Sequence, residues 1–230
     1  MCARVSHTVP SPRRIEARVR ALPNRSVPNV RGVRRAVNRE IAGASAKDVL
    51  AFAEALIVHT PYVPRWFAYE LVHYHPAAMA ALDASRLERL GAGIDDWHHV
   101  DPFGCYLTGP AWREGQVSDD RMHRWAKSRD LWWRRTALVS TVALNCTARG
   151  GAGDTKRTLA VCDLLLADRE DMVVKALSWA LRELASKDAA SVRRYLTAHE
   201  DGMAARVRRE VRNKLELGRK NPKRPRGPRA

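Results

Sequence analysis

The sequence lacks the patterns of membrane and secreted proteins. No stretch approaches the roughly 20 uninterrupted apolar residues that a membrane-spanning helix needs, and the first residues lack the apolar run of a secretion signal. Cys2, Cys105, Cys146 and Cys162 are scattered without a CxxC pair. This cysteine usage favours a reducing compartment, so we expect a cytoplasmic protein without membrane contact.

Common catalytic and cofactor motifs are also missing. The sequence has no Walker loop, no dinucleotide-binding glycine fingerprint, no GxSxG elbow and no HExxH helix, which removes the common NTPase, Rossmann, hydrolase and zincin interpretations. His98, His99 and Cys105 could suggest a metal, but adjacent histidines on a helix point about 100° apart and no second ligand pair has suitable spacing. We expect neither a metal nor a cofactor.

Lysine and acidic residues are scarce relative to arginine. Only eight of the 41 basic residues are lysines, and with 25 acidic residues the formal net charge is +16. A surface this positive repels itself unless it meets a polyanion, and the arginine fork fits phosphate with two parallel hydrogen bonds. Nucleic acid is therefore the favoured partner, although richness in alanine and arginine can also follow from a coding bias.

The basic residues are not confined to one end of the chain. Residues 219–230 hold six basic residues, no acid, and prolines and a glycine that oppose a packed element, which predicts a disordered basic tail. Without those six charges the remainder still carries +10. We expect a flexible N-terminus over residues 1–12 and one folded, monomeric domain over residues 13–218 that is basic in its own right.

Apolar residues recur at helical spacing along most of the chain. No segment long enough to form a strand alternates apolar with polar residues, as a half-buried strand does. Helix start signals are present at Asp130 and at Asp154, and a glycine-rich loop between them supplies a stop signal. The pattern predicts an all-α protein with helices over residues 12–22, 29–42, 47–59, 64–74, 84–91, 97–108, 118–127, 130–146, 154–166, 171–186, 189–198 and 203–216.

These helices come in pairs with short links. That rhythm favours a HEAT-like α-solenoid of stacked antiparallel hairpins, although no strict sequence repeat is visible. A compact irregular bundle is the alternative.

Three segments place polar or aromatic residues on unexpected helix faces. In residues 171–184, Val173, Leu177 and Leu181 share the apolar stripe, whereas Trp179 points the other way, among basic and polar neighbours. Such a tryptophan is either an aromatic surface for a sugar or base, or a residue buried against the next helix.

In the second segment, Arg135 falls within the apolar stripe of residues 131–145, where an unpaired cation would be costly. Arg134 and Arg135 also crowd a helix N-terminus, where the helix dipole favours a phosphate over a cation. They predict either an anion site or an intramolecular bridge to a carboxylate.

The third segment is IDDWHHVDPFGCYL, in which Trp97 and Asp101 lie four residues apart over the small Gly104. An aromatic ring and a carboxylate on one helix face leave room for a ligand. The alternative is structural, because Asp101 followed by Pro102 is also a common helix start, with Asp as the cap.

Together the three segments resemble the signature segments of the AlkD-type DNA alkylation-repair glycosylases, a family of HEAT-like solenoids. Trp97 and Asp101 are similar to the family's tryptophan and aspartate spaced four apart, Arg135 to the arginine of its W-x-x-R-A segment, and Trp179 to its second cleft tryptophan. Pro28 and Arg31 give a weaker match, and the resemblance covers roughly residues 25–220. Pro102 departs from the family pattern.

The resemblance implies a glycosylase that removes cationic alkylated purines from double-stranded DNA, working on the nucleoid with a concave basic face. It implies that Asp101 stabilises the sugar cation, that Trp97 and Trp179 pack on the nucleotide, and that Arg135 holds a phosphate or orients Asp101. No lysine stands out as a Schiff-base nucleophile, so we expect base loss without strand cleavage. The basic residues expected to contact DNA are Arg31, Arg34, Arg134, Lys175 and Arg182.

Two other functions stay open from the sequence alone. A HEAT-like protein could hold damaged or branched DNA without catalysis, and Asp101 is the residue that favours catalysis over this alternative. A protein-binding solenoid adaptor would explain the helices but not the charge of the folded part.

Overall fold

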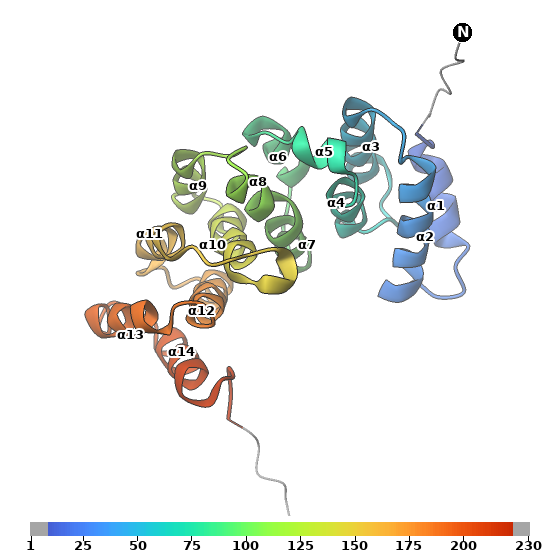
Figure 1. Ribbon diagram of the computed structural model, residues 1–230. Coiled ribbons are helices and arrows are strands. Elements are labelled where there is room, and N and C mark those ends of the chain that lie inside the picture. Colours follow the sequence, from blue (N-terminus) through green and yellow to red (C-terminus); the bar gives the residue numbers. More distant parts are fainter. Residues whose placement is uncertain (1–8, 223–230) are drawn as a thin grey trace, which may run out of the picture. The chain divides into compact units, whose positions relative to one another are not determined.

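The computed structural model describes residues 9–222, and every regular element within them is a helix, which confirms the all-α prediction (Figure 1). Contacts divide the chain into two compact units, with the boundary between residues 118 and 119. Most of the segment 1–12 and of the tail 219–230 lies outside the described residues, so their predicted flexibility stays a prediction. So does the single domain over residues 13–218. Within the described part, no helix is long and apolar enough to cross a bilayer.

Unit 1 alternates its helices between two layers. Helix α1 contacts α3 and α3 contacts α6 in one layer, whereas α2 contacts α4 and α4 contacts α7 in the other, which we call the α2–α4–α7 layer (Figure 1). The elements are α1 (Pro12–Arg20), α2 (Val27–Glu40), α3 (Ala46–His59), α4 (Arg65–His73), α5 (Pro76–Ala80), α6 (Ala84–Gly91), α7 (Trp97–Phe103), a π-helical turn (Gly104–Thr108) and α8 (Gly109–Arg113).

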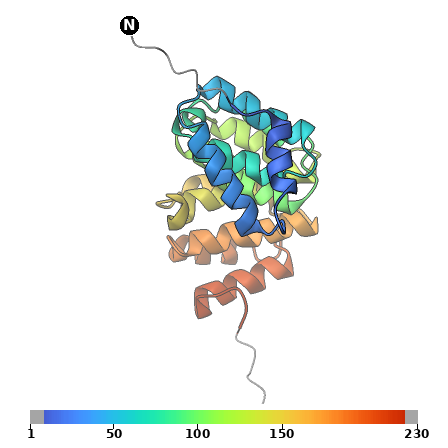
Figure 2. The same cartoon turned by 90° about the vertical axis from the view of Figure 1, so that its right-hand side faces the viewer.

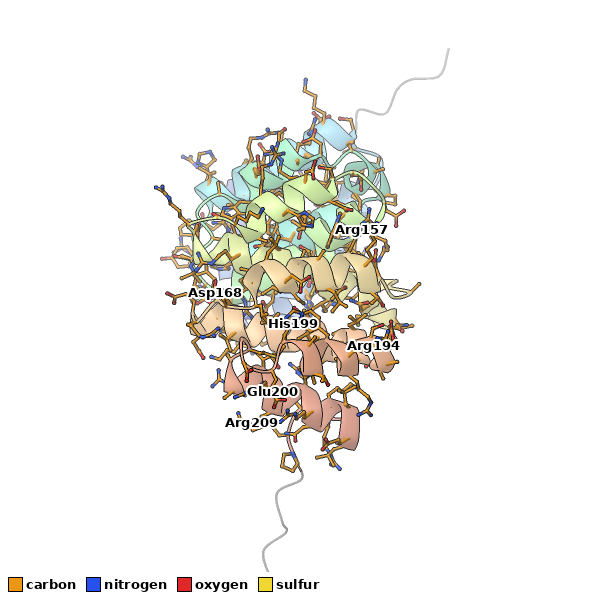
Figure 3. All side chains as sticks on the ribbon, turned by 90° about the vertical axis from the view of Figure 1, so that its left-hand side faces the viewer. Arg157, Asp168, Arg194, His199, Glu200 and Arg209 are labelled. Carbon is orange, nitrogen blue, oxygen red and sulfur yellow. The ribbon has the colours of Figure 1, made fainter. Side chains whose placement is uncertain are left out.

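Unit 2 has the same alternation. Helices α10, α12 and α14 contact one another in sequence and form the α10–α12–α14 layer, in which α12 and α14 lie side by side (Figure 2). Helices α9, α11 and α13 lie on the other side of the unit, the side that faces the viewer in Figure 3, where Arg157 marks α11 and Arg194 marks α13. The elements are α9 (Asp119–Ala126), α10 (Leu131–Asn145), a 3₁₀ turn (Thr147–Arg149), α11 (Thr155–Leu165), α12 (Asp171–Ala185), α13 (Ala189–Ala198) and α14 (Ala205–Leu217).

Most predicted helices are present within a few residues of their predicted ends. The start signals act as expected: the Asp130 carboxylate accepts a hydrogen bond from the backbone N–H of Trp132, and that of Asp154 from Arg157. Each therefore satisfies an amide that has no partner within its own helix. Helices α5 and α8 were not predicted, because five residues are too few to display a period.

The loop between α10 and α11 shows why glycine is needed in one place. Gly151 is buried, and its N–H donates to the Cys146 carbonyl at 3.0 Å. A β-carbon there would lie 2.6 Å from the carbonyl oxygens of Ala143 and Leu144. Since these are backbone atoms at the end of α10, they cannot move aside as a flexible side chain can.

We predict that Gly151→Ala lowers stability by about 1–3 kcal/mol, as overpacking does in other interiors. In a thermal melt this corresponds to a fall in Tm of about 2–4 °C per kcal/mol. Gly32→Ala is the matched control, because its β-carbon would approach nothing closer than an Arg35 nitrogen at 4.0 Å and loss of a helical glycine stabilises by up to about 1 kcal/mol. An unchanged or higher Tm for Gly151→Ala would show that the loop relaxes.

Candidate functional site

Helix α7 carries Trp97 and Asp101 in unit 1. Its N-cap is Asp96, whose carboxylate accepts from the backbone N–H of His98 at 2.8 Å. Asp101 lies in the body of the helix, with a partly exposed side chain. The alternative that Asp101 caps a helix is therefore wrong, because the helix starts earlier and Asp96 performs that role.

Trp97 lies in the first turn of α7 and is 42% exposed. Its ring stacks on that of His98, with centroids 3.5 Å apart. The apolar side of the helix holds Val100 and Phe103, both fully buried. Trp97 and Asp101, four residues apart, thus share the side of α7 that does not pack against the core.

Pro102 does not break the helix that presents Asp101. The backbone keeps helical angles through Gly104 and Gly109, but residues 104–108 form a π-helical turn. Prolines 102 and 110 lie on either side of this turn, and each lacks the amide hydrogen that an α-helical ladder requires. The predicted uniform helix over residues 97–108 is therefore interrupted by a turn in which the Gly109 N–H donates to the Gly104 carbonyl, five residues back.

A carbonyl of this turn, that of Tyr106, also has a partner from another helix. His73 of α4 contacts that carbonyl through Nδ1 at 3.0 Å. Because the acceptor is an oxygen, Nδ1 must carry the hydrogen, and this bond ties the π-helical turn to α4.

Arg65 holds the segment that leads into α7. Its guanidinium donates to three carbonyls at and beyond the end of α6, where the helix dipole favours a cation. The buried Tyr69 hydroxyl accepts from Arg65 Nε at 3.1 Å and donates to one of the same carbonyls, and burial raises the pKa of Tyr69 to about 12. The three carbonyls that bind Arg65 belong to Leu90, Ala92 and Gly93.

The two arginines predicted on α2 converge on one carboxylate of α4. Glu70 is 1% exposed; its Oε1 accepts from Arg31 Nε at 2.8 Å and its Oε2 from Arg34 Nε at 3.2 Å. Arg34 also donates to Asn38, and its guanidinium lies over the Tyr74 ring at 4.3 Å. The buried carboxylate thus has both of its oxygens paired with a cation.

These contacts give the two predicted DNA ligands on α2, Arg31 and Arg34, different roles. Arg34 is 7% exposed with its donors directed at interior partners, which speaks against the prediction that it contacts phosphate. The Arg31 side chain is 40% exposed, and the hydrogen bond that it donates to Glu70 raises its pKa further. Arg31 thus keeps its charge and reaches the surface.

In unit 2, Arg134 forms the carboxylate bridge that was one of the two sequence-based interpretations. Its Nε donates to Asp168 at 2.7 Å, and its Nη1 donates to the carbonyls of Ser128 and Arg129. Asp168 lies in the link between α11 and α12 and is labelled in Figure 3. Arg134 therefore joins two loops, and this structural role speaks against the prediction that it is a phosphate ligand.

Arg135 is buried, as its place in the apolar stripe of α10 predicts. It is 5% exposed, and its Nη1 donates to the Met172 carbonyl in the first turn of α12. A guanidinium taken from water needs such partners. Arg135 thereby fixes α10 against the helix that carries Trp179.

Trp179 is partly exposed on α12, so part of its ring remains accessible and is not covered by a neighbouring helix. Its indole N–H donates to Glu183, one turn later, at 3.1 Å. One turn earlier, Lys175 Nζ lies 2.6 Å from Asp171, and this contact and its charge lower the pKa of that carboxyl. The ring is therefore oriented within its own helix by its bond to Glu183, and the same helix also holds the Lys175–Asp171 ion pair.

Arg182, the last predicted DNA ligand, has a buried support. Its Nε donates to Ser178 at 3.2 Å, and the Ser178 hydroxyl donates to Glu210 of α14 at 2.6 Å. Glu210 is itself buried. Burial lowers the pKa of Arg182, so a nearby anion would stabilise its charged form.

Each unit gathers its candidate residues in one layer. Those of unit 1 lie on the α2–α4–α7 layer and those of unit 2 on the α10–α12–α14 layer. Sequence reasoning missed the supporting residues Glu70, Arg65 and Glu210. Glu70 alone had a usable signal, because it is a carboxylate within the apolar run WFAYELV.

A comparison with known families agrees with this arrangement. A family model described as DNA alkylation repair enzyme matches residues 23–215, a span that includes every candidate residue named above. No curated protein matches the sequence. The chain belongs to the DNA alkylation repair enzyme family, and it therefore acts in the repair of alkylated DNA.

Proposed function

We propose that this protein is a monofunctional DNA glycosylase that hydrolyses the N-glycosidic bond of N3- and N7-alkylated purines in duplex DNA. The observation that carries the proposal is Asp101, a partly exposed carboxylate held in the body of α7 beside an exposed tryptophan. The protein would act as a cytoplasmic, nucleoid-associated monomer without a cofactor.

The chemistry requires little more than a fixed negative charge. An N3- or N7-alkylated purine is cationic, so its glycosidic bond is already weak and the base leaves as a neutral molecule. The deoxyribose then takes on oxocarbenium character. A carboxylate that is held in place beforehand stabilises that charge and can orient the attacking water.

Trp97 and Trp179 would contribute through the faces of their rings. A cation over an indole face is stabilised by about 0.5–2 kcal/mol, depending on how far water is excluded. The exposure of Trp97 and the partial exposure of Trp179 support a contact with a nucleotide. We propose that Arg135 acts by positioning, through its hydrogen bond to the Met172 carbonyl of the helix that carries Trp179.

Arg31, Lys175 and Arg182 are the proposed phosphate ligands. Arg31 and Arg182 are held by Glu70 and Ser178, so less conformational entropy is lost when they bind an anion. Lys175 is paired with Asp171. An ammonium held in an ion pair is a poor nucleophile, which supports base loss without strand cleavage.

Asp101→Asn should lower kcat/KM for release of N7-methylguanine or N3-methyladenine by on the order of a hundredfold or more, because the amide carries no charge. Affinity for undamaged duplex should change little. Each protein is incubated with methylated DNA, and mass spectrometry of the free methylpurine measures the rate of release. Asp95→Asn is the control, since that exposed carboxyl precedes α7. Normal release by the Asp101 variant would refute the assignment of Asp101, whereas no release by the wild type would leave only the non-catalytic, DNA-binding alternative.

Trp179→Ala should weaken both lesion affinity and turnover by roughly ten- to a hundredfold, the amount expected for one lost stacking contact. Trp179→Phe keeps a flat ring and should recover most of the loss, although it cannot donate to Glu183. Single-turnover kinetics with a methylated duplex separate binding from chemistry. If the alanine variant has the kcat/KM of the wild type, Trp179 is a packing residue.

DNA affinity should fall steeply with salt, with a log–log slope of about −0.9 for each phosphate neutralised. Arg182→Gln should make this slope shallower by about 0.9, the contribution of one phosphate. Arg34→Gln should leave the slope unchanged, because Arg34 is an interior residue. Fluorescence anisotropy over a salt series measures both. A slope near zero for the wild type would argue against phosphate contacts altogether.

A further inference from the structure

An open cleft of about 370 Å³ lies between the first turns of α2 and α4 in unit 1. This volume is at the lower end of the range for small-molecule sites, roughly 300–1,000 Å³. The cleft belongs to the α2–α4–α7 layer but involves neither Trp97 nor Asp101. Its lining is Arg25, Val27, Val30, Pro61, Tyr62, Pro64 and Trp66; we call it the Tyr62 cleft.

The Tyr62 cleft presents flat aromatic surface. Tyr62 is 45% exposed, and Trp66 is partly exposed. A large exposed aromatic ring gains little by remaining in water, and a second one in the same cleft makes a platform on which a flat ring can stack.

Guanidinium groups surround these rings. Arg20 and Arg25 lie over the Tyr62 ring, at 4.7 and 5.5 Å from its centroid, and Arg31 lies over Trp66 at 5.4 Å. Within residues 9–222, neither Arg20 nor Arg25 has a carboxylate within ion-pair distance. Both therefore keep their forked donors for an anion.

The lining contains no acidic residue. Three cations around two aromatic rings disfavour a cationic ligand and favour one that combines a flat ring with a negative charge. A nucleotide has both parts, and in duplex DNA its base is stacked and paired, so only an unpaired nucleotide can offer its ring face.

We propose that the Tyr62 cleft binds one unpaired nucleotide of a DNA strand, with the base against Tyr62 and Trp66 and the phosphate held by Arg20 and Arg25. The inference rests on the proposed function in that it takes DNA as the ligand. It adds a second contact, separate from Asp101, that senses strand ends or unpaired positions.

The test compares two DNA ligands that share one paired segment, a blunt duplex and a duplex with a short single-stranded overhang carrying 2-aminopurine. The full-length wild type should bind the overhang duplex about tenfold more tightly, the gain expected from one stacked base, and should quench the 2-aminopurine fluorescence. Tyr62→Ala and Arg25→Gln should lose this preference while their affinity for the blunt duplex changes less than threefold.

Two substitutions serve as controls. Tyr62→Phe keeps the ring and should keep the preference. Tyr74→Ala removes another exposed tyrosine that has an arginine over its ring, outside the Tyr62 cleft, and should behave as the wild type does. Circular-dichroism melts of all variants establish that the fold is intact.

The proposal is overturned if the wild type has no preference for the overhang, or if Tyr62→Ala retains it. It is also overturned if Tyr74→Ala loses the preference as fully as Tyr62→Ala does. Release of methylpurine from the blunt duplex by the wild type is measured in parallel. Absence of that release would refute the glycosylase proposal, whereas the overhang preference alone decides whether the Tyr62 cleft binds a nucleotide.

Discussion

Two prolines in one helical run are the constraint on which the presentation of Asp101 depends. Pro102 and Pro110 remove two amide hydrogens from the ladder between Trp97 and Arg113, and a helix with such gaps normally kinks or ends. Here the ladder widens into a π-helical turn, and His73 binds a carbonyl of that turn. Because α4 supplies His73 and also Arg65, it holds the segments that precede and follow α7.

The arginines of this chain divide into those that hold the fold and those that reach the surface. Arg34, Arg65 and Arg134 direct their donors at carbonyls or carboxylates of the fold, whereas the Arg31 side chain is 40% exposed and Arg182 is partly exposed. The number of arginines in the sequence therefore does not give the number of phosphate ligands. We propose that the DNA contacts come from the subset whose internal partners leave part of the guanidinium accessible.

Helices and their caps could be predicted because both depend on neighbours in sequence: Asp130 and Asp154 cap the helices that follow them. Arg34 could not be assigned from sequence, because its partner Glu70 is 36 residues away and no local pattern links the two. The π-helical turn escaped prediction for a different reason, since apolar periodicity reports the buried face and not the hydrogen-bond ladder. Trp97, Asp101 and Trp179 were identifiable because each departs from the apolar stripe of its own helix.

The central claim is that the Asp101 charge stabilises a cationic sugar, and binding to a sugar analogue tests it without turnover. One duplex carries a pyrrolidine that is cationic at neutral pH in place of the deoxyribose, and another carries the neutral tetrahydrofuran. The account predicts that the wild type binds the cationic duplex at least tenfold more tightly, a difference of about 1.4 kcal/mol, and that Asp101→Asn binds the two alike. Equal affinity of the wild type for both duplexes would contradict it.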